Sequence, residues 1–138
     1  MRGKHLLKHW SLTQSTVTLS SAESELSGIC KGSSISLGLV SVAKDLGFHW
    51  ALAVETDAAA AIGISRRRGL GKIRHLAVAD LWIQDRVRSG DIILRKVAGS
   101  ENASDILTKF VERPLLWKHL ERMGLVMEDG RAAMAPTI

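Results

Sequence analysis

The sequence is poor in cysteine and proline, with one cysteine and two prolines among 138 residues. The lone cysteine, Cys30, excludes a disulfide framework and a zinc site built on paired thiolates. Few prolines, 46% hydrophobic residues and 24% charged residues are typical of globular proteins and exclude a collagen-like or disordered chain. The composition therefore predicts one compact unit with a hydrophobic core.

Long apolar runs are also missing. The uncharged stretch 32–43 is rich in serine and glycine and falls short of the about 20 apolar residues that span a bilayer. The opening residues, MRGKHLLKHWSLTQ, lack the continuous apolar region of a secretory signal. We therefore expect an intracellular protein, cytoplasmic or nuclear, with no membrane segment.

Acidic residues are absent before Glu23 and again from 66 to 75, where the sequence reads RRRGLGKIRH. The net charge is +5, so the chain as a whole is basic. Local positive charge without acids suits contacts with nucleic-acid phosphates, although a solvated loop without function is the alternative. The candidate contact residues are Arg66, Arg67, Arg68, Lys72, Arg74 and His75.

Hydrophobic spacing alternates between the period of strands and that of helices. Residues 20–23 fit the S-x-x-E capping box of a long helix that Gly47 ends, and the run 50–56 is typical of a strand buried on both faces. The expected elements are a strand at 8–19, a helix to 47, a strand at 50–56, helices at 58–67 and 73–89, a strand at 91–98, and helices at 103–111 and 114–124. This order predicts a three-layer α/β protein with at least two parallel strands joined through helices.

Three carboxylates, Glu25, Asp57 and Asp105, fall where an expected strand passes into a helix. The carboxyl ends of parallel strands share one edge of a sheet, where α/β proteins place ligands. Clustered carboxylates attract hard cations such as Mg²⁺, and two such ions can activate water for phosphodiester cleavage. The alternatives are structural, since Asp57 could cap a helix and Asp105 could complement a helix dipole.

The long helix offers two glutamates near its start. Glu23 takes the acidic position of the capping box, whereas Glu25 lies about 200° further round the helix. Glu25 is therefore expected beside Gly28 and Ile29, on the side that borders the core, and is the preferred metal ligand.

Five segments carry a resemblance to a known family. They are WSLTQSTVTLSSAESEL at 10–26, VETDAAAAI at 54–62, GKIRHL at 71–76, IQDRVRSGDIILRKV at 83–97 and ENASDILTK at 101–109. Together, in this order and spacing, they resemble the ribonuclease H domain that closes the polyprotein of copia-type retrotransposons.

The resemblance implies a ribonuclease H-like fold, a five-stranded mixed sheet flanked by helices that cleaves the RNA strand of RNA–DNA hybrids with two Mg²⁺ ions. It matches Glu25 to the family's helix glutamate, Asp57 to the strand-end aspartate and Asp105 to the late-helix aspartate. It also implies a partner, the reverse transcriptase portion of such a polyprotein, and backbone contacts from the basic residues to the hybrid.

The chain also departs from the family. An earlier segment of the form Y-x-D-x-D-W-A-G supplies the family's first strand and first aspartate, and nothing before Trp10 resembles it. Residues 1–126 are therefore expected to form a partial domain that lacks the first two strands, followed by a disordered tail at 127–138. Weak or absent cleavage is expected. The alternative function is a non-catalytic nucleic-acid-binding module or a degenerate transposon fragment.

Overall fold

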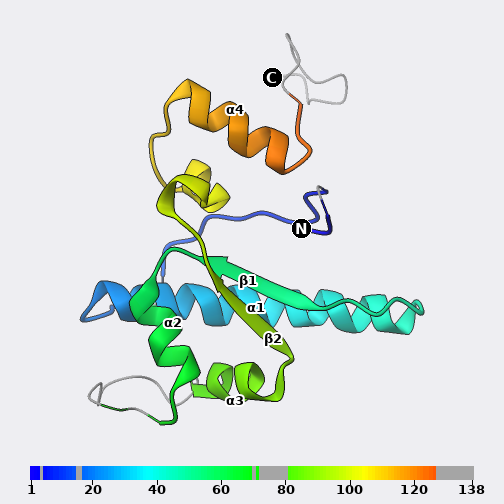
Figure 1. Cartoon of the computed structure of the whole chain (residues 1–138), viewed down its shortest axis with the longest axis vertical. Helices are drawn as coiled ribbons and strands as arrows, with labels where there is room; N and C mark the ends of the chain where they lie inside the picture. Colours follow the sequence, from blue (N-terminus) through cyan, green and yellow to red (C-terminus); the bar gives the residue numbers. More distant parts are fainter. Residues whose placement is uncertain (4, 15–16, 70, 72–80, 127–138) are drawn as a thin grey trace. The chain divides into compact units, whose positions relative to one another are not determined.

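The computed structural model describes residues 1–3, 5–14, 17–69, 71 and 81–126. The chain divides into two compact units (Figure 1). The central unit is Thr13–Asn102, and the terminal unit combines Met1–Leu12 with Ala103–Ile138. The expected tail at 127–138 lies outside the described residues.

Helix α1, Ser21–Asp45, begins and ends where its sequence signals indicate. The hydroxyl of Ser20 accepts from the backbone N–H of Glu23 at 3.3 Å and donates to the Glu23 carboxylate at 3.0 Å, while that carboxylate accepts from the backbone N–H of Leu19 at 3.1 Å. Gly47, with φ of +82°, permits the two backbone bonds that close the helix, from Gly47 N to Lys44 O and from Phe48 N to Ala43 O. The predicted capping box and glycine stop are both confirmed.

Strands β1, Leu52–Thr56, and β2, Ile92–Lys96, form a two-stranded parallel sheet. They are joined through α2, Ala59–Arg66, and α3, Trp82–Ser89, which ends at a left-handed Gly90. The predicted parallel strands connected by helices, and with them a mixed helix and strand protein compatible with α/β, are confirmed. Of the helix expected at 73–89, residues 73–80 lie outside the described part of the chain.

The predicted burial of 50–56 on both faces is wrong. Exposure alternates along β1, with Ala53 and Glu55 exposed, and β2 likewise exposes Ile93 and Arg95. The register pairs Ala53 with Ile93 and Glu55 with Arg95, so within the central unit one face of the sheet is covered and the other is open. The apolar run at 50–56 therefore belongs to a short strand of which only one face packs against helices.

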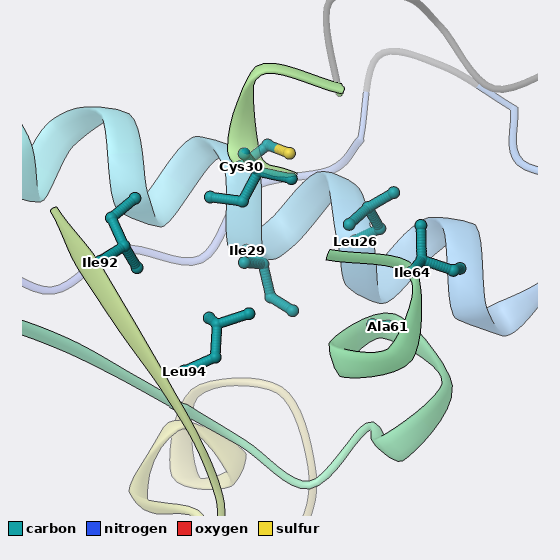
Figure 2. Packing of buried hydrophobic residues seen from close by; sticks show 8 residues of the cluster. Leu26, Ile29, Cys30, Ala61, Ile64, Ile92 and Leu94 are labelled. Atoms are coloured by element: carbon teal, nitrogen blue, oxygen red, sulfur yellow. The ribbon is translucent and has the colours of Figure 1, made fainter. Parts of the chain in front are cut away.

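The core of the central unit lies between the covered face of the sheet and the helices (Figure 2). Side chains from α1 project toward the strand residues Ile92 and Leu94, and toward Ile64 on α2. The buried cluster consists of Leu26, Ile29, Cys30, Ala61, Ile64, Ile83, Ile92 and Leu94. Helical and strand periodicity in the sequence therefore converge on one cluster.

The strand expected at 8–19 is not found in its described residues, 8–14 and 17–19. Gln14 instead binds the first turn of α1, donating to Ser24 O at 2.8 Å and accepting from the Ser24 hydroxyl at 3.0 Å. A strand needs a neighbour to pair its backbone groups, and these residues pair with neither β1 nor β2. The alternation of Thr, Val and Trp favours a strand but does not provide the second strand with which it must pair.

The terminal unit contains a short 3₁₀ helix, η3, at Ala103–Leu107 and helix α4 at Arg113–Arg122. The helix expected at 103–111 is thus a shorter and tighter element. Helix α4 ends as predicted near Gly124, whose φ is +67°. Gly124 N bonds Glu121 O and Leu125 N bonds Leu120 O, the same closing pattern as in α1.

Helix α1 is long and apolar enough to cross a membrane by length and composition alone. The same helix supplies Leu26, Ile29 and Cys30 to the core of the central unit. A core helix of this length passes the same test, so the finding is weak support for a membrane segment.

Candidate functional site

Asp57 lies immediately after β1 and is half-buried. It does not cap α2, whose N-cap is Ala58 without a side-chain bond. The hydroxyl of Thr56 takes the local role instead, accepting from the backbone N–H of Ala58 at 3.1 Å. The alternative reading of Asp57 as a helix cap is therefore wrong, and its carboxylate is left for another use.

That carboxylate faces the turn that follows β2. Nδ2 of Asn102 donates to Oδ1 of Asp57 at 3.3 Å, across 45 residues of sequence. Gly99, in the 3₁₀ turn η2 at Gly99–Glu101, lies so near that an added Cβ would be 3.5 Å from Oδ2 of Asp57. Because the strands are parallel, the residues that follow them meet at one edge, as the sequence predicts for Asp57.

Glu25 lies in the second turn of α1 and is exposed, whereas its neighbour Leu26 is buried. The expectation that Glu25 borders the core is wrong, because the buried stripe of α1 passes through Glu23, Leu26 and Ile29. The prediction for Glu23 is confirmed, since its side chain and backbone form the capping box with Ser20. Glu25 has no hydrogen-bond or ion-pair partner among the described residues.

Asp105 lies in η3 of the terminal unit, with 17% of its side chain exposed. Its carboxylate forms an ion pair with Lys109 at 3.0 Å. Glu25 and Asp57 belong to the central unit, so their grouping with Asp105 stays a prediction. Over the described ranges, no three His, Cys, Asp or Glu side chains gather into a group able to hold a metal ion.

The donor atoms of the three predicted ligands are all carboxylate oxygens, the type that Mg²⁺ prefers. Asp57 has no cationic partner within the described residues, so its charge is available to an ion. In this respect the residues fit the predicted metal.

The three consecutive arginines at the end of α2 have different environments. Arg66 donates from Nη2 to the backbone oxygen of Leu94 on β2 at 2.9 Å. The guanidinium of Arg67 lies against Gly71, where an added Cβ would come within 2.7 Å of Nη1. Arg68 is exposed, and no partner of it occurs among the residues described. Arg68 is therefore the arginine of this group whose charge is most available to a ligand.

The other predicted contacts, Lys72, Arg74 and His75, lie outside the described residues. The arginines of α3 have acidic partners on the surface: Arg86 pairs with Asp91 at 2.9 Å and Arg88 with Asp85 at 3.1 Å. Hydrogen bonds from Arg86 and then Ser89 hold the pKa of Asp91 below its ordinary value of 3.8. Positive charge on α3 is thus partly neutralised, unlike that of Arg68.

Sequence reasoning missed Gln84, which is 5% exposed on α3. Its carboxamide bonds three backbone groups near the arginines: Nε2 donates to Ile64 O at 2.9 Å and to Gly69 O at 3.1 Å, and Oε1 accepts from Gly69 N at 2.8 Å. The available signal was a glutamine directly after the apolar Ile83 on an amphipathic helix, a polar side chain at a position that borders the core.

Comparison of the chain with protein-family models, with curated proteins and with solved structures finds no match.

Proposed function

We propose that the chain is the later part of a ribonuclease H-like domain of the copia type, and that its ancestral activity is Mg²⁺-dependent cleavage of the RNA strand of RNA–DNA hybrids. The position of Asp57 carries the proposal. Its carboxylate stands at the carboxyl edge of two parallel strands, is not used as a helix cap, and accepts a bond from Asn102 of the next strand-to-helix connection. The five sequence segments at the family's spacing add support.

The finer fold in this proposal is a three-layer domain with a mixed sheet that lacks its first two strands. The open face of the β1–β2 sheet supports it, because parallel sheets are usually covered on both faces. The absence of a strand in the described residues of 8–19 is consistent with it, because that segment would need a strand neighbour.

In this proposal Glu25, Asp57 and Asp105 would hold Mg²⁺, which supplies activation of the attacking water and stabilisation of the leaving oxygen. Asn102 orients the Asp57 carboxylate. The basic segment at 66–75 binds the phosphate backbone of the hybrid. The family's first aspartate has no counterpart in the chain, so cleavage is weak or absent. The partner would be the reverse transcriptase part of a polyprotein, inside the cell.

The test is cleavage of a labelled RNA–DNA hybrid in Mg²⁺, with Asp57→Asn compared with a matched control, Asp45→Asn, at the exposed end of α1. We expect hybrid binding that weakens steeply with salt, and any cleavage to disappear in Asp57→Asn and persist in Asp45→Asn. Cleavage that survives Asp57→Asn would overturn the assigned site, and failure of the protein to bind the hybrid would overturn the proposed function.

The second candidate is a nucleic-acid-binding module without catalysis, favoured by Arg68, which is exposed and has no partner among the described residues. It predicts binding without cleavage and no effect of Asp57→Asn on affinity. In either case Arg68→Gln lowers the slope of log affinity against log salt by about 0.9, the effect of one lost phosphate contact. Arg88→Gln, which removes an arginine already paired with Asp85, is the matched control.

A further inference from the structure

The side chain of Gln84 bonds the backbone on both sides of the three arginines at 66–68. Its amide nitrogen binds Ile64 O, a carbonyl of the last turn of α2 that has no partner within the helix, and both backbone groups of Gly69 bind the same carboxamide. One side chain therefore fixes the chain just before and just after residues 66–68. All its amide hydrogens are used in these bonds.

The conformation at Gly69 makes this closure possible. Its φ is +70°, which L side chains rarely adopt. Glycine here turns both the N–H and the C=O toward Gln84, and the buried carboxamide replaces the water that these groups would otherwise bind.

As a result, the three arginine side chains have different surroundings. Arg66 is bonded to β2 and Arg67 lies against Gly71, whereas Arg68, exposed just before the anchored Gly69, has no partner among the described residues. A cation on an anchored backbone loses less conformational freedom when it binds a phosphate than one on a free loop.

We infer that Gln84 is a positioning residue for nucleic-acid binding, which anchors the backbone at Gly69 so that Arg68 presents its guanidinium to a phosphate of the bound duplex. The inference rests on the proposed function, because it assumes that this arginine segment contacts nucleic acid. Gln84 itself touches no phosphate and acts through Arg68.

The experiment compares Gln84→Met, which keeps the side chain's length and removes all three bonds, with Ile83→Val, which trims the adjacent core residue and touches none of them. Affinity for a fluorescent RNA–DNA hybrid is measured by anisotropy over a range of salt. Exchange of the Gly69 amide proton is followed by NMR, which reports the anchor without any ligand.

We expect Gln84→Met to weaken hybrid binding about threefold to tenfold at low salt and to reduce the salt slope by about 0.9, as one phosphate contact would. Exchange of the Gly69 amide is expected to rise at least about tenfold, since its bonded acceptor is gone. Ile83→Val should leave the slope and the Gly69 exchange unchanged. Gly69→Ala, which strains the anchored backbone, should shift the slope in the same direction as Gln84→Met.

The outcomes separate the two proposals. If the unmodified protein binds the hybrid and Gln84→Met binds with an unchanged salt slope, the inference about Gln84 is overturned and the proposed function stands. If the unmodified protein fails to bind, both are overturned, whatever the Gly69 amide shows. An equal loss of slope in Ile83→Val would reduce Gln84 to a general stabilising residue and overturn the inference.

Discussion

The central and terminal units use the same local signals and reach different degrees of burial. Helices α1 and α4 end in the same glycine-dependent pattern of backbone bonds. Every residue of the buried hydrophobic cluster nevertheless belongs to the central unit. In the terminal unit, among its described residues, Phe110 is 95% exposed and the fully buried His119 has no hydrogen-bond partner for either ring nitrogen. Helix signals thus define elements, while a core requires several elements whose apolar faces meet.

The largest expected difference between the two units is in the effect of truncating an apolar side chain on the free energy of unfolding. Leu26→Ala in the central core should lower the free energy of unfolding by about 2–5 kcal/mol, because it removes burial and leaves a cavity. Phe110→Ala, at an exposed position, should change it by less than about 0.5 kcal/mol. Urea denaturation of both variants checks this. Equal losses would mean that the terminal unit buries Phe110 in solution and would contradict the contrast.

The helix N-termini give a smaller effect. Ser20→Ala removes both hydroxyl bonds of the capping box and should cost about 1 kcal/mol. Helix α4 has Glu112 at its N-cap with no side-chain bond, so Glu112→Ala should cost less than about 0.5 kcal/mol. Thermal unfolding followed by circular dichroism measures both. A larger cost for Glu112→Ala would show a cap on α4 that the structure lacks.

Replacing buried polar groups that lack partners with apolar ones should raise stability. The hydroxyl of Ser33, in the middle of α1, is buried with no hydrogen-bond partner in the described part of the chain, so Ser33→Ala should stabilise the protein by about 1 kcal/mol. In the terminal unit His119→Leu should act in the same direction for the same reason. Higher unfolding temperatures are the expected readout. A loss of stability in His119→Leu would reveal a bonding partner for the imidazole.

The smallest expected effect is on the pH dependence of stability and comes from the exposed ion pair between Arg86 of α3 and Asp91. The pKa of Asp91 is lower in the folded chain than its ordinary value of 3.8, because Arg86 and Ser89 bond its charged form. Its contribution to stability is therefore present above about pH 4 and is lost as the pH falls through the lower folded pKa. Asp91→Asn should flatten the pH dependence of the unfolding temperature slightly between about pH 5 and pH 2, since the pair is exposed. An unchanged profile would contradict this role.

The sequence predicted local features well and long-range ones unevenly. The capping box at Ser20 and the strand segments at 50–56 and 91–98 follow from nearby residues, and they are found with small changes of boundary. The strand at 8–19 was wrong because strand propensity describes a side chain's fit to a sheet and does not provide a partner strand. Glu25 proved exposed because a position on a helix wheel does not say how wide the buried stripe is.

The candidate site shows the same division. The sequence marked Asp57 as a carboxylate at a strand end and left a helix cap as the alternative. The structure removed that alternative, because Thr56 bonds Ala58 and Asn102 bonds Asp57 across the sheet edge. The arginines at 66–68 look equivalent in sequence, yet Arg66 bonds the backbone of β2, whereas no described residue bonds Arg68. Pairings across 28 or 45 residues depend on strand order, which no local pattern encodes.

By itself, the sequence determined the start and end of α1, the end of α4, the basic segment at 66–75 and the acid at the end of β1, because caps, charge runs and short apolar runs act over a few neighbouring residues. Tertiary structure alone decided which sheet face is covered, which arginine is bonded to β2 and why Gln84 is buried. These depend on contacts between α1, α2, α3 and the strands, where a buried polar group must find its partners in whatever lies beside it.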